Sequence, residues 1–205
     1  MKKVLLMLGV MLFSASAFAM NQEAMDDKTC AEKKAAFEEN VAGQRTDFVV
    51  QYILINMADP MKNMTDEQAQ PLAVCYATYE VKGEKFTKFV RDNANIFPGD
   101  ITRKEEAKLL DFAERVELLS EKEEFARVVR VGNETNIMEY IWEKMISPLK
   151  EMSDAQAAPK AKVYATLKVN GLPLTDYVRA HSRSYDMYAE TVVEAFVDRV
   201  EKLSK

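Results

Sequence analysis

The alternation of apolar and polar residues predicts helices along most of the chain. Residues 136–145 place their apolar side chains on one face at helical spacing, which is typical of an amphipathic helix; these side chains are Ile137, Met138, Ile141, Trp142 and Met145. Residues 48–57 are more uniformly apolar and by themselves fit either a buried strand or a buried helix. We expect both segments to be helices that end before Asp59-Pro60 and Ser147-Pro148.

The sequence repeats itself at an offset of 88 residues, and the repeat aligns these two segments. Between residues 57 and 93, 17 of 37 positions are identical to the residue 88 positions later, whereas average composition gives roughly two or three by chance. We therefore predict an all-α fold that is a tandem duplication of a unit of about four helices. The retained residues include Pro60/Pro148, Tyr76/Tyr164, Gly83/Gly171 and Arg91/Arg179.

The expected helices of the first copy cover about 30–42, 47–58, 66–82 and 88–115, with a last helix of the second copy at 176–203. Helix starts are indicated by residues that fit the capping box, Thr29–Glu32, Thr65–Gln68, Thr102–Glu105 and Ser120–Glu123. In the second copy, Ser153 stands at the place of the Thr65 cap and Gln156 at that of Gln68. The alternative for the third element is a β-hairpin over 72–86 and 160–174. Residues 160–169 alternate in polarity, and Asn170-Gly171 is a typical hairpin turn. We favour the helix because alanine is abundant and Gly171-Leu172-Pro173 resembles a helix end.

The two copies are predicted to form one continuous helical body. No linker rich in glycine, serine or proline separates them, and a helix at 103–119 is expected to run from one unit towards the next. We assign residues 20–27 to a flexible N-terminus, 28–115 to the first unit and 116–205 to the second.

Residues 1–19 have the features of a cleavable signal peptide. Lys2-Lys3 precedes ten apolar residues, Val4 to Phe13, and small residues lead to a cut after Ala19. The apolar run is shorter than the roughly 20 residues that a membrane span requires, and no later segment is long and apolar enough. We expect a mature protein in the periplasm or outside the cell, with no membrane span.

Charge and cysteine content further limit the possible partners and the possible chemistry of the chain. Removal of residues 1–19 takes away two lysines and changes the formal net charge from −5 to −7, which disfavours nucleic acid as a partner. Cys30 and Cys75 are the two cysteines of the chain, and in an oxidising compartment such a pair is predicted to form a disulfide. Neither lies in a Cys-x-x-Cys motif that would favour metal binding or a catalytic thiol.

No catalytic constellation is evident, and we expect a protein that is not an enzyme. His181 is the single histidine, no Gly-x-Ser-x-Gly motif is present, and zinc sites draw on several His or Cys ligands. A glycine loop for phosphates is also missing from the sequence, so no cofactor is expected. We interpret His181 as a residue of a helix surface or interface.

The spacing of Met57, Met61 and Met64 raises a copper(I) hypothesis, because thioethers are soft ligands. In the second copy, Leu149 replaces the middle methionine, which keeps the bulk and loses the ligand. Core packing is therefore favoured over a metal site.

The polar-capable residues that both copies retain are the candidate site for a ligand or partner: Arg91, Arg179, Tyr76 and Tyr164. The alternative is that they tie helices together, with each arginine bridging to Asp66 or Asp154 and each tyrosine hydroxyl at the rim of the core.

Residues 64–68, Met-Thr-Asp-Glu-Gln, resemble the Leu-Thr-x-x-Gln signature of periplasmic stress chaperones of the Spy type, and residues 152–156 are similar. A capping box gives the same pattern, and this chain is acidic where those chaperones tend to be basic. Our first hypothesis is an exported helical-repeat protein that binds another envelope protein or peptide, as a chaperone-like factor. The alternative is a small-ligand or copper(I) binder that uses the repeat interface.

Overall fold

The computed structural model describes residues 26–96, 102–182 and 187–205. The predicted signal peptide at 1–19 lies outside these ranges, as does most of the segment 20–27. The described chain is mostly helical, with two small two-stranded sheets, which confirms the all-α class.

Residues 26–96 fold into five α-helices, one π-helical turn and a short hairpin. Asp26 accepts a hydrogen bond from the Thr29 N–H at 2.7 Å and so caps the first helix. The elements are α1 (Asp27–Val41), α2 (Thr46–Ile53), η1 (Leu54–Ala58), α3 (Asp59–Lys62), α4 (Asp66–Ala77), β1 (Glu80–Val81), β2 (Glu84–Lys85) and α5 (Phe86–Asn93).

The chain from residue 102 onward begins with one long helix, and a similar series of elements follows it. The bounds of α7, η2, β3, β4 and α10 lie 88 residues beyond those of α2, η1, β1, β2 and α5. The elements are α6 (Thr102–Val131), α7 (Glu134–Ile141), η2 (Trp142–Ile146), α8 (Ser147–Glu151), α9 (Asp154–Tyr164), β3 (Lys168–Val169), β4 (Leu172–Pro173), α10 (Leu174–His181) and α11 (Met187–Leu203).

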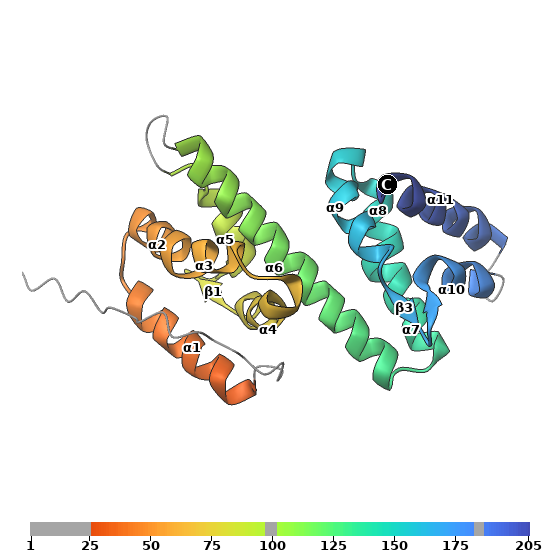
Figure 1. Cartoon of the computed structure of the whole chain (residues 1–205), viewed down its shortest axis with the longest axis horizontal. Helices are drawn as coiled ribbons and strands as arrows, with labels where there is room; N and C mark the ends of the chain where they lie inside the picture. The colour runs from red at the N-terminus through yellow and green to blue at the C-terminus, as the bar shows by residue number, and fades with distance from the viewer. Residues whose placement is uncertain (1–25, 97–101, 183–186) are drawn as a thin grey trace, which may run out of the picture.

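The long helix α6 belongs to two hydrophobic cores. Figure 1 shows α1 to α5 on one side of it and α7 to α11 on the other. Its first half supplies Leu109, Phe112 and Val116 to a core that extends from Phe37 to Leu119. Its second half supplies Phe125 to a core that extends to Val200. The predicted unit boundary at 115/116 therefore lies inside one helix.

The expectation that helices end before the two proline pairs is wrong. At both places the chain stays helical by widening one turn: the Asp59 N–H donates to the Leu54 carbonyl and the Ser147 N–H to that of Trp142, five residues back. A proline ring clashes with the carbonyl four residues earlier in a regular α-helix, and a π-turn moves that carbonyl away.

The expected helix over 66–82 is too long, and part of the hairpin alternative is correct. The helix ends at Ala77, and a hairpin pairs Glu80 with Lys85 and Val81 with Glu84. Lys82 and Gly83 both have positive φ, 53° and 81°, as a two-residue type I′ turn requires. Asn170 and Gly171 repeat this turn, with φ of 52° and 87°.

The expected helices at 88–115 and 176–203 are each two helices. α5 ends at Asn93 and α6 begins at Thr102, and the sequence between them contains Pro98-Gly99. α10 ends at His181 and α11 begins at Met187, and the sequence between these two residues contains neither proline nor glycine. Ser120 does not begin a helix: it lies inside α6, where its hydroxyl donates to the Glu117 carbonyl at 2.9 Å.

Candidate functional site

A cleft of about 370 Å³ lies between α3 and the first half of α6. Four of its residues, Lys104, Lys108, Asp111 and Arg115, follow one another along α6 at intervals of three or four residues and so share one helix face. The remaining lining residues are Ala58, Asp59, Met61, Lys62, Ala107 and Phe112.

One ion pair crosses the cleft, and two other lysines of the lining have no ion-pair partner among the described residues. The Lys108 ammonium lies 3.0 Å from a carboxylate oxygen of Asp59, and both side chains are partly exposed. Within the described part of the chain, Lys62 and Lys104 make no ion pair. Their ammonium groups are therefore free to meet an anion that enters the cleft.

Arg115 forms one end of the cleft and fixes its geometry. Its guanidinium donates to the carbonyls of Met61 and Met64, each at 2.7 Å, and to the Asp66 carboxylate at 2.8 Å. The Met61 carbonyl belongs to the last turn of α3 and the Met64 carbonyl lies just beyond that helix, where regular helical hydrogen bonds run out. The arginine thereby holds α3 and the start of α4 against α6.

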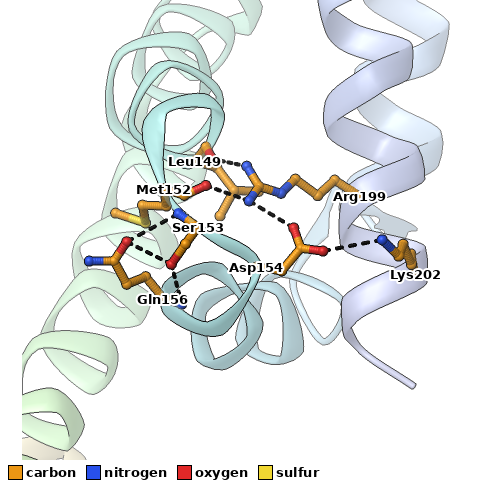
Figure 2. A network of polar contacts seen from close by, with 7 residues as sticks. All are labelled: Leu149, Met152, Ser153, Asp154, Gln156, Arg199 and Lys202. Carbon is orange, nitrogen blue, oxygen red and sulfur yellow. Dashed lines mark hydrogen bonds and ion pairs between the residues drawn. The ribbon is translucent and has the colours of Figure 1, made fainter.

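Arg199 makes the same set of contacts in the second half. Figure 2 shows its guanidinium donating to the carbonyls of Leu149 and Met152 and to the Asp154 carboxylate, which Lys202 also contacts. The hydrogen bonds from Lys202 and Arg199 lower the pKa of Asp154. The acceptors of Arg199 lie 88 residues beyond those of Arg115, whereas the two arginines are 84 residues apart. The first part of α6 therefore aligns with α11 at an offset of 84 residues.

At these offsets, the second half lacks most charges of the cleft. Ser147 and Val192 stand where Asp59 and Lys108 form their ion pair, and Tyr188 stands where Lys104 does. Ala195 replaces Asp111. Lys150 keeps the charge of Lys62. Because Asp59, Lys104, Lys108 and Asp111 have no charged counterpart in the second half, most of the cleft charges are a property of the first half.

The two predicted site tyrosines lie in different cores. Tyr76 is 9% exposed and packs against Tyr79, Phe86 and Phe112. Burial, with a smaller contribution from Tyr52, raises the pKa of Tyr76 to about 12. Tyr164 is 2% exposed in the second core, and burial likewise raises its pKa.

The two predicted site arginines each join the last two helices of their half. Arg91 on α5 lies 2.6 Å from Glu117 on α6, and Arg179 on α10 pairs with Glu194 and Glu201 of α11 at 3.3 and 2.8 Å. The expected bridges from these arginines to Asp66 and Asp154 are wrong, because Arg115 and Arg199 occupy those carboxylates. None of the four predicted residues lines the cleft.

The predicted disulfide is confirmed. The sulfur atoms of Cys30 and Cys75 are 2.08 Å apart, and the bond joins α1 to α4. This link matters because Phe37 is the fully buried residue of α1.

The histidine contacts other groups of the protein, and the methionines pack in or against the first core. His181 Nδ1 lies 2.7 Å from the Tyr177 carbonyl, and its Nε2 lies 3.6 Å from the Glu134 carboxylate. Met57 and Met61 are buried in the first core, against which Met64 also packs. Within the described ranges, no three His, Cys, Asp or Glu side chains are grouped so that they could hold a metal ion.

No sequence motif indicates the cleft directly. The stripe at 104, 108, 111 and 115 was visible as a charged helix face, but such faces are usually solvated. Its meaning depends on Asp59 and Lys62, which come from another element.

Comparison with known proteins identifies no relative. Family models, curated proteins and solved structures all gave no match to this chain. In addition, no helix among the described residues has the length and apolar character needed to cross a membrane.

Proposed function

We propose that the mature chain is an exported, non-enzymatic binding protein of the bacterial envelope, and that it binds its ligand in the cleft between α3 and α6. The observation that carries the proposal is the cleft's composition: its lining combines the apolar residues Ala58, Met61 and Phe112 with several lysines. Concave sites with a largely apolar lining and a few polar groups are where proteins bind ligands. Export rests on the features of residues 1–19.

We also infer that the chain arose by tandem duplication and that its two halves then diverged. The internal identity at an offset of 88 residues supports this, as do the matching element bounds and the recurring arginine contacts. In this proposal the second half keeps the supporting framework, and the first half carries the binding site.

The proposal is tested by filling the cleft. Ala107 is exposed on α6, so Ala107→Trp is expected to block the cleft without disturbing a core. The matched control is Thr191→Trp, at the equivalent exposed position of α11. Mature protein, residues 20–205, is used to capture ligands from envelope extract, and bound proteins and small molecules are identified by mass spectrometry.

The wild type and Thr191→Trp should retain the same ligand, and Ala107→Trp should lose it. Equal retention by Ala107→Trp would show that the ligand binds outside the cleft. If the wild type retains nothing above background, the binding function itself is refuted.

Export has a separate test. The protein purified from the periplasmic fraction should begin at Met20, as N-terminal sequencing would show. Recovery of the chain with Met1 in the cytoplasm would contradict this part of the proposal.

A further inference from the structure

We propose that the ligand of the cleft is a small amphipathic anion, with a carboxylate or a similar head group and an apolar body. This inference rests on the proposed function and adds the chemical class of the ligand. Three observations carry it: the local charge, the apolar floor and the dimensions of the cleft.

The charge around the cleft is opposite to that of the whole chain. Lys62, Lys104, Lys108 and Arg115 line it with only Asp59 and Asp111 as acids, whereas the chain has a formal net charge of −5. Arg115 and Lys108 already have carboxylate partners. The ammonium groups of Lys62 and Lys104 can form charge-assisted hydrogen bonds to an incoming anion.

The interior of the cleft suits a hydrocarbon or aromatic group. Met61 and Phe112 are almost fully buried and form its deeper surface together with Ala58. A polar anion such as free phosphate would leave this surface without a partner. A ligand that joins an apolar body to an anionic head satisfies both parts of the cleft.

The dimensions favour a small molecule over a docked helix. The volume of about 370 Å³ is at the lower end of the range for ligand sites. The α6 wall from Lys104 to Arg115 is about 16 Å long, but the opposite wall, from Ala58 to Lys62, is only about 6 Å. A helix bound in a groove anchors residues i to i+7, about 10 Å apart, and needs two long walls.

The experiment compares three probes that share one alkyl chain and differ in their heads. Mature wild-type protein is titrated calorimetrically with dodecanoate, dodecyl maltoside and dodecyltrimethylammonium, each below its micellar concentration. We expect saturable binding of one dodecanoate per chain and at least tenfold weaker binding of the neutral and cationic probes.

Paired variants separate a specific role of the cleft lysines from the general effect of charge. Lys62→Gln/Lys104→Gln should weaken dodecanoate binding about tenfold or more. Lys144→Gln/Lys150→Gln removes the same charge from exposed positions of the second half and should leave the affinity unchanged. Ala107→Trp should abolish binding.

The other outcomes overturn the inference in distinguishable ways. Equal affinity for dodecyl maltoside would show an apolar site without preference for anions. Equal weakening by both lysine pairs would show non-specific attraction. If dodecanoate does not bind while extract capture still depends on Ala107, the ligand belongs to another class, such as a peptide, and the proposed function stands.

Discussion

At the scale of single residues, the buried tyrosines connect the structure to alkaline stability. Tyr76 keeps its proton to a pH of about 12 in the folded chain, against about 10 when exposed. Between these values the unfolded chain loses a proton that the folded chain retains. Stability is therefore fully present below pH 10 and falls as pH rises, by about 1.4 kcal/mol per pH unit for this residue.

We predict that alkaline unfolding and tyrosine ionisation occur together. The tyrosinate absorbance and the far-ultraviolet circular dichroism should change in one transition between about pH 10 and 12. Tyr76→Phe should raise the midpoint, because one ionisable group is removed from the core. Complete tyrosine ionisation below pH 10 with the helices intact would contradict the burial that we describe.

Sequence reasoning at this scale succeeded where one residue type dictates the chemistry. The disulfide followed from two cysteines and an oxidising compartment. The partners of Arg91 and Arg179 did not follow, because a surface arginine can reach several acids. The choice between Asp66 and Glu117 depends on how α5 and α6 cross, which no local pattern encodes.

At the scale of elements, the arginine contacts hold the ends of helices that are too short to persist alone. α8 has five residues, and Arg199 donates to the Leu149 carbonyl inside this helix and to the Met152 carbonyl just after it. The side chain of Arg199 is 20% exposed, so these contacts are partly shielded from water. Removing it takes one of two hydrogen bonds from the Leu149 carbonyl and takes the Arg199 hydrogen bond from the Met152 carbonyl.

We therefore predict that Arg199→Ala lowers the free energy of unfolding by about 2–3 kcal/mol. Arg199→Lys should restore less than half of this, because an ammonium cannot span two carbonyls and a carboxylate as a planar guanidinium does. Lys202→Ala, which removes an exposed contact to the same Asp154, should cost less than about 0.5 kcal/mol. Urea unfolding measures all three, and equal effects of Arg199→Ala and Lys202→Ala would refute the role of Arg199.

The disulfide leads to a second prediction at this scale, which concerns α1. It closes a loop with a sequence separation of 45 residues, for which the chain-entropy relation gives about 4 kcal/mol. Cys30→Ser/Cys75→Ser should lose up to this amount and should increase amide exchange most strongly in Asp27–Val41, since α1 has few buried side chains. Unchanged exchange in α1 would show that packing alone holds it.

Element types were more predictable than element ends. Thr65–Gln68 and Ser153–Gln156 form the predicted capping boxes, whereas Ser120–Glu123 has the same pattern inside α6. A capping box needs a free helix start. At Ser120 the apolar residues Val116, Leu119 and Phe125 keep α6 in contact with both cores, and this tertiary packing outweighs the local signal.

At the scale of the whole molecule, α6 contributes residues to both cores. Near its middle, Glu121 pairs with Lys160 of α9 at 2.5 Å, and Glu123 accepts a hydrogen bond from Gln70 of α4. Both halves therefore contact the same two turns of this helix. Loss of those turns should separate the unfolding of the two cores.

We predict that Ser120→Pro uncouples them, at a cost of about 3 kcal/mol or more. Ser120→Ala is the control, since alanine favours the helix. The single tryptophan, Trp142, packs against the second core. Its fluorescence should coincide with circular dichroism during urea unfolding of the wild type and of Ser120→Ala, and should diverge from it in Ser120→Pro. Coincident transitions in Ser120→Pro would show that α6 does not couple the cores.

Because α6 runs without interruption between the two cores, a change in its length also changes the angle and the distance between them. Each residue added between Leu119 and Phe125 would turn one half against the other by about 100° and move it about 1.5 Å along the axis. Seven added residues would nearly restore the angle at about 10 Å greater separation. Insertions and deletions here can therefore set the angle between the halves in discrete steps, while the residues of either core remain unchanged.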